Sequence, residues 1–152
     1  MTQTVLAIDD SPEIHQILKV RLKNLDVELA HADCGSDGFN QAMASNPDLI
    51  LLDVMMPDAS GFDLCRKLKA TPETRNIPVI FLTGASDVEQ MVLGFDVGAV
   101  DYIQKPFDSV ELNARVRAAL RTKRFQDRLA QRAMIDGLTG LWNRAHFDQR
   151  LH

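Results

Sequence analysis

Several apolar runs in this sequence end on side chains that suit phosphoryl chemistry. In chain order these side chains are Asp9, Asp10, Asp53, Thr83 and Lys105. Carboxylates brought together repel one another by about 4 kcal/mol per pair at about 4 Å, with an effective dielectric of ~20. A divalent cation offsets this repulsion, and hard oxygen ligands of this kind suit Mg²⁺ rather than zinc or copper. The acids therefore predict a magnesium site.

The same residues are suited to moving a phosphoryl group onto a carboxylate. With a cation bound, Asp53 keeps an oxygen free to attack phosphorus. Lys105 can pair with one phosphoryl oxygen, and the Thr83 hydroxyl can donate to another. Gly84 has no side chain, so its backbone N–H can come close to the group. We therefore predict phosphoryl transfer onto Asp53.

Short apolar runs bounded by Pro and Gly predict the elements that must position these side chains. The run at 49–53 is typical of a strand buried on both faces. Strands are expected at 4–8, 26–30, 49–53, 77–82 and 99–103, with helices starting at 11, 38, 61, 87 and 108. This alternation predicts an α/β fold with a doubly wound parallel sheet. The carboxyl ends of parallel strands share one edge, so the polar residues are expected to converge there.

These residues and their neighbours resemble the receiver domain of two-component response regulators. The resemblance rests on Asp9-Asp10, Leu52-Asp53-Val54-Met55-Met56-Pro57, Gly61, Leu82-Thr83-Gly84-Ala85 and Asp101-Tyr102-Ile103-Gln104-Lys105-Pro106. It holds throughout residues 1–120. The resemblance implies a flavodoxin-like, five-stranded sheet with strand order 2-1-3-4-5.

The resemblance also implies a role for each acidic residue. Asp53 would be the phosphoacceptor, and a histidine kinase or a phosphotransfer protein would be the donor. Asp10, Asp53 and the backbone carbonyl of Met55 would bind Mg²⁺. Asp9 would help through a water molecule. The backbone N–H of Gly84 and the Lys105 side chain would stabilise the phosphoryl group, together with Thr83.

A switch and a dimer interface are expected from the same resemblance. Thr83 and Tyr102 would form the switch pair, in which the hydroxyl moves toward the phosphoryl group and the ring turns inward. Phosphorylation would then change the face made by the fourth helix, the fifth strand and the fifth helix. We expect this face and the C-terminal helix to form a homodimer.

Each of these roles has a simpler structural alternative. The acids could form turns at strand ends, Lys105 could be a surface lysine, Thr83 a helix cap and Tyr102 a packing residue. Phosphatases of the haloacid-dehalogenase type are a remote functional alternative, since they also use an aspartate nucleophile with Mg²⁺ on a parallel sheet. Their nucleophile ends the first strand in an Asp-x-Asp motif, whereas the first strand here ends in Asp9-Asp10-Ser11.

The helical pattern that begins at 108 continues beyond the region that a sheet can cover. Residues spaced 4, 3, 4 and 3 apart follow along it: Ala118, Thr122, Phe125, Leu129 and Arg132. This spacing predicts a parallel helix pair. We therefore expect a receiver domain at 1–122 and a helical linker, with coiled-coil character, at 123–135.

The last stretch resembles the opening of a diguanylate cyclase domain of the GGDEF type. Asp136–Arg144 matches the pattern Asp-x-Leu-Thr-Gly-Leu-x-Asn-Arg in full. The catalytic Gly-Gly-Asp-Glu-Phe segment lies downstream in that family and does not occur here, so this chain is not expected to be an enzyme. We expect 136–152 to be the truncated start of such a domain, in a parent protein that makes cyclic di-GMP. The alternative is a stand-alone receiver that acts as a phosphate sink or an interaction module.

Composition supplies the remaining expectations. Residues 1–110 hold 17 acids and 8 bases, a net charge of −9, whereas 111–152 hold 4 acids and 9 bases, a net charge of +5. The arginines of the basic part mix with Gln and Asp, which is typical of a solvated helix face, and no nucleic-acid partner is expected. No apolar run approaches the roughly 20 residues needed to cross a bilayer. A cytoplasmic protein without a membrane partner is expected, with Cys34 and Cys65 serving structural roles.

Overall fold

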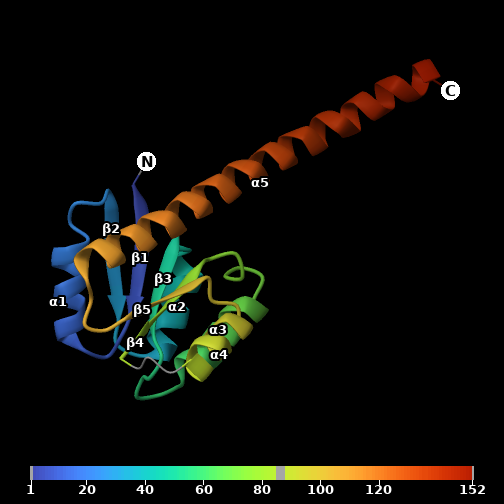
Figure 1. Ribbon diagram of the computed structural model, residues 1–152. Helices are drawn as coiled ribbons and strands as arrows, with labels where there is room; N and C mark the ends of the chain where they lie inside the picture. The colour runs from blue at the N-terminus through green and yellow to red at the C-terminus, as the bar shows by residue number, and fades with distance from the viewer. Residues whose placement is uncertain (1, 85–87, 152) are drawn as a thin grey trace.

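The computed structural model describes residues 2–84 and 88–151, with side chains described at 2–84 and 90–134. Strands and helices alternate along this part of the chain (Figure 1). The elements are β1 Gln3–Ile8, α1 Pro12–Arg21, β2 Val27–Ala32, α2 Gly35–Ser45, β3 Leu49–Asp53, α3 Gly61–Ala70, β4 Val79–Thr83, α4 Val88–Asp96, β5 Asp101–Gln104 and α5 Ser109–Leu151. The α/β alternation expected from the sequence is confirmed.

The sheet is parallel, and its strand order is β2-β1-β3-β4-β5. The expected doubly wound architecture is therefore confirmed. β3 is the middle strand, where Leu52 pairs with Ile8 of β1 and Asp53 pairs with Leu82 of β4. This register places the carboxylate of Asp53 at the centre of the carboxyl edge of the sheet.

Two strands, β4 and β5, begin two residues later than the sequence indicates. The backbone of Pro78 has no N–H to donate, so it contributes only its carbonyl, which accepts from Ile50 at 3.0 Å, and β4 begins at Val79. The N–H of Ala99 donates to Gly94 at the end of α4, so β5 begins at Asp101 rather than at 99. Both shifts leave the functional side chains at the strand ends.

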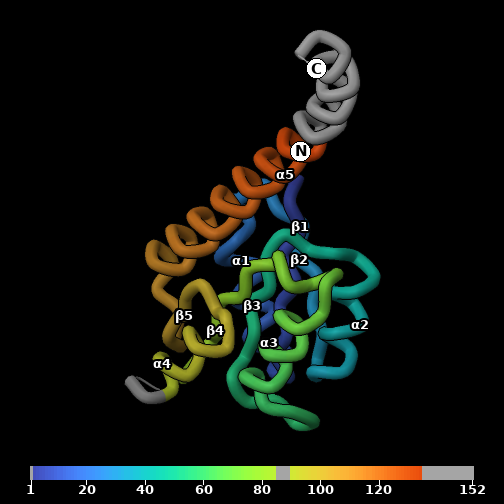
Figure 2. The backbone as a smooth tube through the Cα atoms, turned by 90° about the vertical axis from the view of Figure 1, so that its right-hand side faces the viewer, coloured from blue at the N-terminus to red at the C-terminus, as the bar shows by residue number. Residues whose placement is uncertain are grey.

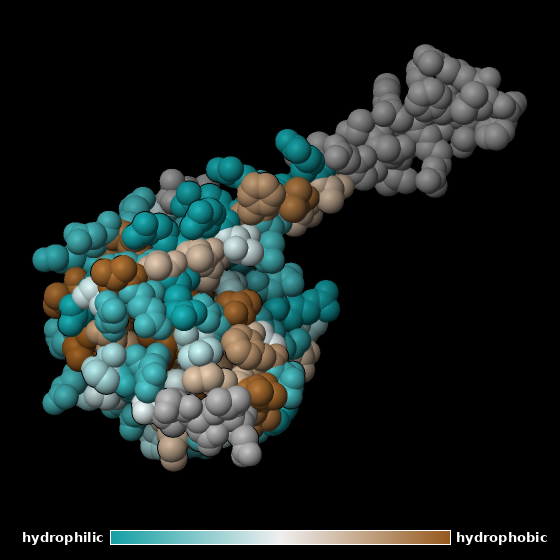
Figure 3. Space-filling model, in the orientation of Figure 1, coloured by the Kyte–Doolittle hydropathy of each residue, from teal (hydrophilic) through white to brown (hydrophobic). Residues whose placement is uncertain are grey.

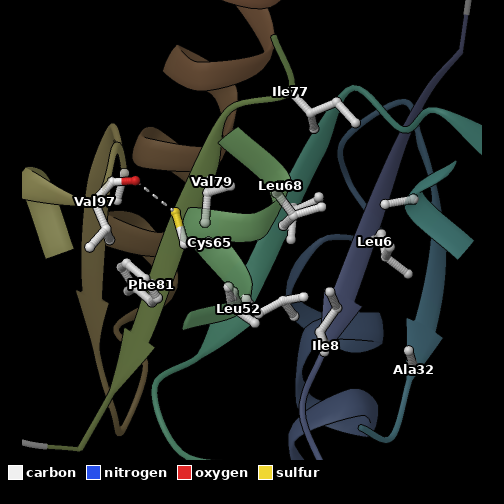
Figure 4. Packing of buried hydrophobic residues seen from close by; sticks show 14 residues of the cluster. Leu6, Ile8, Ala32, Leu52, Cys65, Leu68, Ile77, Val79, Phe81 and Val97 are labelled. Atoms are coloured by element: carbon white, nitrogen blue, oxygen red, sulfur yellow. Dashed lines mark hydrogen bonds between the residues drawn. The ribbon is translucent and has the colours of Figure 1, made fainter. Parts of the chain in front are cut away.

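The sheet separates two hydrophobic cores. In β1, Leu6 and Ile8 belong to the core that includes residues of α2 and α3, whereas Val5 and Ala7 belong to the core under α1 and α5. Figure 4 shows the first of these cores, in which the Cys65 thiol donates to the carbonyl of Val97 at 3.5 Å. Because both faces are covered, the strands are apolar on both sides, which explains their unbroken hydrophobic runs.

Helix α5 packs on the sheet over its first part and then continues past the sheet edge (Figures 1 and 2). Leu112, Val116 and Leu120 are buried, whereas Phe125 and Leu129 are 63% and 52% exposed. Figure 3 shows apolar side chains on this outer part of α5, among hydrophilic ones. Beyond Leu120, the described part of α5 therefore carries apolar side chains that the sheet does not cover.

The residues of the 4-3-4-3 spacing, which we call the seam residues, are all exposed: Ala118, Thr122, Phe125, Leu129 and Arg132. The Asp136–Arg144 motif and the expected segment at 136–152 lie outside the residues whose side chains are described. Among the described residues, no helix is long and apolar enough to cross a membrane.

Candidate functional site

Four strands deliver the candidate residues to one edge of the sheet. Asp9 follows β1, Asp53 is the last residue of β3, and Thr83 is the last residue of β4. Thr83 pairs with Gln104 of β5, and the next residue is Lys105. The backbone N–H of Lys105 donates to the Thr83 carbonyl at 2.7 Å, which joins the two strand ends directly. The convergence predicted from the parallel topology is thus observed.

Asp9, Asp10 and Asp53 form an acidic cluster. Each offers a carboxylate oxygen, and these oxygens lie within 4.8 Å of one another. Among the described residues, this is the one group of three or more acidic, His or Cys side chains with that spacing. Asp9 is fully buried, Asp53 is half-buried and Asp10 is exposed. A set of hard oxygen donors open to solvent on one side fits a divalent cation such as Mg²⁺.

Lys105 supplies a single positive charge to this cluster. Its Nζ atom lies 2.9 Å from Asp9 Oδ2 and 3.5 Å from Asp53 Oδ1. The peptide bond between Lys105 and Pro106 is cis. One ammonium cannot balance three carboxylates, so the ionised cluster keeps a net charge near −2. That residual charge matches the charge of one divalent cation.

The pKa of Asp53 is raised above its ordinary value of 3.8. Burial is the largest cause, and the negative charge of Asp9 adds to it. Lys105 opposes the rise, as does the backbone N–H of Met55, which donates to Asp53 Oδ1 at 3.3 Å. An aspartate that holds its proton more tightly than a free one is also a more basic, and so more reactive, nucleophile when ionised.

The loop between β3 and α3 is held close to Asp53 by Gly61. The backbone N–H of Gly61 donates to the Val54 carbonyl at 2.7 Å. A Cβ atom at Gly61 would lie 2.2 Å from the backbone oxygen of Asp53. Glycine is therefore required here by close approach of two backbone segments. Met55 is 77% exposed, and it forms an isolated antiparallel β-bridge with Ser60 across the loop.

Thr83 and Tyr102 lie beside the same small pocket, between β4, β5 and α4. Thr83 is buried and Tyr102 is half-buried, and the pocket between them is also lined by Phe81 and Phe95. The Tyr102 ring meets Phe95 edge to face, with 6.0 Å between ring centroids, and the Arg115 guanidinium lies 5.7 Å from its centroid. Tyr102 therefore makes the contacts expected of a packing residue, and it does so at a position next to Thr83.

The structure gives no packing reason for glycine at position 84. A Cβ atom added to Gly84 would meet no atom of the described residues within 4 Å. The close approach expected at the Gly84 backbone would therefore come from a phosphoryl group and not from another described part of the folded chain. Ala85, which follows it in the motif, lies outside the described residues.

Four contacts around the site were not found by sequence reasoning. The N–H of Ser11 donates to Asp9 Oδ1 at 2.9 Å, and the His15 ring Nε2 lies 2.6 Å from the Asp9 carbonyl oxygen. Asp58 accepts from the backbone N–H groups of Gly35 and Ser36 at 2.8 and 3.0 Å, which lowers the pKa of Asp58. An acid directly after a Pro resembles an ordinary turn residue, so the sequence offered no signal for this cap on α2.

Comparisons with known proteins agree with this geometry. Residues 5–117 match the family described as response regulator receiver domain. The chain is 40% identical over 129 residues to the DNA-binding dual master transcriptional regulator RpaA of Synechocystis sp., which covers 85% of this chain and 52% of RpaA. It is 40% identical over 154 residues to response regulator PleD of Caulobacter vibrioides, which covers 92% of this chain and 34% of PleD.

A solved structure with a similar fold is that of the chemotaxis protein CheY4 of Vibrio cholerae. The TM-score is 0.73 at 28% identity, and the match covers 78% of this chain and 99% of that chain. The chain described here spans about half the length of RpaA and about a third of PleD.

Proposed function

We propose, for a chain that belongs to the response regulator receiver domain family, that Asp53 accepts a phosphoryl group from a histidine kinase or a phosphotransfer protein. The observation that carries the proposal is the Lys105 ammonium, which lies between Asp9 and Asp53 at the centre of the carboxyl edge. A receiver domain accepts a phosphoryl group and does not itself turn over a substrate. We expect the exchange to take place in the cytoplasm.

Asp53 acts as the nucleophile in this proposal. One carboxylate oxygen attacks phosphorus, so that a P–O bond forms while the P–N bond to the donor imidazole breaks and its electron pair stays on nitrogen. Lys105 is close enough to Asp53 to pair with a phosphoryl oxygen in the product. Its link to buried Asp9 fixes the ammonium at the strand end before the donor arrives.

A divalent cation completes the proposed site. Asp10, Asp53 and the Met55 carbonyl would hold Mg²⁺, with Asp9 contributing through water, and the ion would neutralise charge on the phosphoryl oxygens. The fit rests on the close carboxylate oxygens and on the residual negative charge that Lys105 leaves. Within the acidic cluster, Asp9 is the carboxylate that lies closest to the Lys105 ammonium, at 2.9 Å. This contact is in keeping with Asp9 binding the cation through water rather than directly.

We propose that Thr83 and Tyr102 transmit the phosphorylation state. The Thr83 hydroxyl would turn toward the phosphoryl group, and the Tyr102 ring would turn inward into the space between β4, β5 and α4. Support comes from their shared pocket and from the half-buried position of Tyr102 between Phe95 and Arg115. The change would reach the face of α4, β5 and α5.

We further propose that α5 leads to a diguanylate cyclase output in a longer parent protein. The support is the Asp136–Arg144 pattern, the unbroken α5 helix and the match to PleD, which extends over more of this chain than the match to RpaA. A DNA-binding output is the competing possibility, because RpaA is described as DNA-binding. Phosphorylation would change how two chains pair through the α4, β5 and α5 face and the seam residues.

Labelling with acetyl phosphate tests the acceptor. We expect the chain to gain one phosphoryl group in Mg²⁺, and Asp53→Asn to abolish labelling, as read by intact mass and by peptide mapping. Asp63→Asn is the matched control, because Asp63 is an exposed aspartate whose ion-pair partner is Arg66. Labelling that persists in Asp53→Asn, or that maps to another residue, would overturn the assignment.

Activation by beryllofluoride tests the output. With Mg²⁺, we expect the chain to self-associate more strongly, as measured by sedimentation, and the parent protein to make more cyclic di-GMP. Unchanged association together with unchanged cyclase activity would remove the coupling and favour a phosphate sink or an interaction module. Sequence-specific DNA binding by the parent would instead favour a transcriptional output.

A further inference from the structure

A basic groove lies at the edge of the sheet opposite Asp53. Helix α5 passes the starts of β1 and β2 there, as Figures 1 and 2 show for the N-terminal end of β1. Arg117, Arg121 and Arg124 of α5 line the groove, whose volume is about 260 Å³. Because the groove lies at the opposite ends of the strands, it is separate from the acidic cluster.

The arginines of this groove lack carboxylate partners within the described part of the chain. Among the described residues, no acid lies within ion-pair distance of Arg117, Arg121 or Arg124, whereas Arg115 pairs with Asp101 and Lys123 pairs with Asp127. Arg117 and Arg121 are also four residues apart on one helix, a spacing at which like charges destabilise the helix. A bound anion would relieve this repulsion.

One of the three arginines is already oriented. Arg124 Nη2 donates to Gln3 Oε1 at 2.8 Å, and Gln3 Nε2 donates to the Leu120 carbonyl at 3.0 Å. Gln3 is only 9% exposed, so its hydrogen bond to Leu120 is buried, and its hydrogen bond with Arg124 is partly buried. Holding a guanidinium in place before a ligand arrives lowers the entropy cost of binding.

The rest of the groove wall is largely apolar. Leu25, Val27 and Leu120 line it, and Asp26 is the one carboxylate among its described lining residues. Asp26 accepts a hydrogen bond from the Thr2 hydroxyl at 3.2 Å. An apolar wall next to guanidiniums that no described carboxylate neutralises suits a ligand with a flat, weakly polar part and a chain of phosphates, since guanidinium forks match phosphate oxygens.

We propose that this groove binds a nucleoside oligophosphate, with its phosphates on Arg117, Arg121 and Arg124 and its base against Leu25 and Val27. The groove volume of about 260 Å³ lies just below the lower end of ligand-pocket volumes, roughly 300 Å³, so the groove has room for one mononucleotide at most. The site does not depend on phosphoryl transfer at Asp53. Binding would tie α5 to the start of β1 at the point where the helix leaves the sheet.

Calorimetric titration of the full 152-residue chain with ATP and with GTP tests the proposal. EDTA in the buffer prevents a metal-bound nucleotide from entering the acidic cluster. We expect saturable binding that the double variant Arg117→Gln/Arg121→Gln weakens by about tenfold or more. Asp26→Asn should tighten binding, because it removes the one negative charge from the described groove lining. A purely structural role of Asp26 would not produce this increase in affinity.

Matched controls separate the groove from general attraction to arginines. Arg128→Gln removes an exposed arginine one turn beyond the groove, and we expect its affinity to stay within about twofold of the unmodified chain. Asp53→Asn should leave nucleotide affinity unchanged. Both variants keep the groove residues intact.

Four outcomes would overturn the proposal. They are no saturable binding up to millimolar nucleotide, equal weakening by Arg128→Gln, loss of binding in Asp53→Asn, and tighter binding of a single-stranded oligonucleotide than of ATP. The last would assign the arginines to nucleic acid. None of these outcomes bears on labelling of Asp53 by acetyl phosphate, so the two proposals fail separately.

Discussion

The carboxylate of Asp53 titrates differently from that of a surface aspartate because of its neighbours. Burial and the charge of Asp9 raise the pKa of Asp53, and Lys105 only partly offsets them. The folded chain therefore binds a proton at Asp53 more readily than the unfolded chain does. The contribution of Asp53 to the free energy of unfolding is fully present below the pKa of the unfolded chain, 3.8. It is lost as the pH rises through the pKa of the folded chain.

Asp53→Asn should accordingly make the metal-free chain more stable at neutral pH. The amide removes the buried charge and its repulsion with Asp9, but keeps nearly the same shape. We expect a higher Tm than the unmodified chain at about pH 7 in EDTA, and no difference at about pH 3, where the carboxyl is already protonated. Thermal unfolding followed by circular dichroism measures both.

Addition of Mg²⁺ should reverse this order. The unmodified chain gains about 2.7 kcal/mol when the free ion is at about 100 times its dissociation constant, and Asp53→Asn loses most of that gain. Asp63→Asn should respond to Mg²⁺ as the unmodified chain does. A lower Tm for Asp53→Asn in EDTA at neutral pH would contradict the view that charge repulsion dominates the metal-free site.

Helix α3 owes its position to a glycine at its first residue. Gly61 brings the start of α3 against the Asp53 backbone, where a Cβ atom would lie 2.2 Å from an oxygen that cannot easily move. By contrast, no atom of the described residues lies within 4 Å of the Cβ position of Gly84. The two glycines of the site therefore differ in their structural roles.

Gly61→Ala should destabilise the chain by about 1 to 3 kcal/mol, the usual cost of overpacking. Gly84→Ala is the matched control and should change stability little. Urea unfolding measures the free energy of unfolding of both variants, compared at the same dependence on urea concentration. We also expect Gly61→Ala to slow labelling of Asp53, because the loop that carries Met55 must shift. Equal stability of the two variants would show that the loop relaxes freely.

Helix α2 is capped from another part of the chain. Its own N-cap residue, Cys34, makes no side-chain hydrogen bond, and Asp58 fills this role from the loop after β3. A carboxylate at a helix N-terminus is favoured by the unsatisfied N–H groups and by the helix dipole. These contacts lower the pKa of Asp58, so its stabilisation is present above the ordinary value of 3.8 and is lost as pH falls through the folded pKa.

Asp58→Ala should lower the Tm at neutral pH and have less effect as the pH falls. At about pH 2, where the carboxyl is protonated in either state, the two proteins should unfold at more similar temperatures. Asp63→Ala, at another exposed aspartate, should change Tm little. A Tm difference that is independent of pH would argue against a charged cap.

The whole molecule has opposite charges at the two ends of its strands. The acidic cluster lies at the carboxyl edge, the arginine groove lies at the other edge, and α5 leaves the sheet beside that groove. The seam residues begin close to where the helix leaves, and they are exposed. Exposed apolar residues at this spacing, here Ala118, Phe125 and Leu129, are a typical contact for a second helix.

The double variant Phe125→Glu/Leu129→Glu should weaken self-association of the activated chain by about tenfold or more. Stability of the monomer should not change, since both side chains are largely exposed. Met134→Glu is the matched control, because Met134 is a 70% exposed apolar residue of α5 outside the seam. Sedimentation measures association, and equal weakening by the control variant would remove the seam assignment.

By itself, the sequence determined the strand and helix types, the parallel fold and the identity of the convergent residues. These properties follow from local signals. Apolar runs bounded by Pro and Gly define buried strands, and polar residues at their ends must meet when the strands are parallel. The pairing of Lys105 with Asp9, 96 residues apart, was thus foreseen as proximity, though not as a 2.9 Å contact.

Only the tertiary structure decided the features that depend on close contact between distant segments. The cap from Asp58 lets α2 begin at Gly35, earlier than the expected residue 38. Glycine is required at 61 because the backbone oxygen of Asp53 lies so close, and Gln3 orients Arg124 across the sheet edge. Such contacts depend on positions of a few ångströms that no local pattern encodes. The arginines looked like a solvated helix face in the sequence, and only their place over the start of β1 and β2 made them a groove.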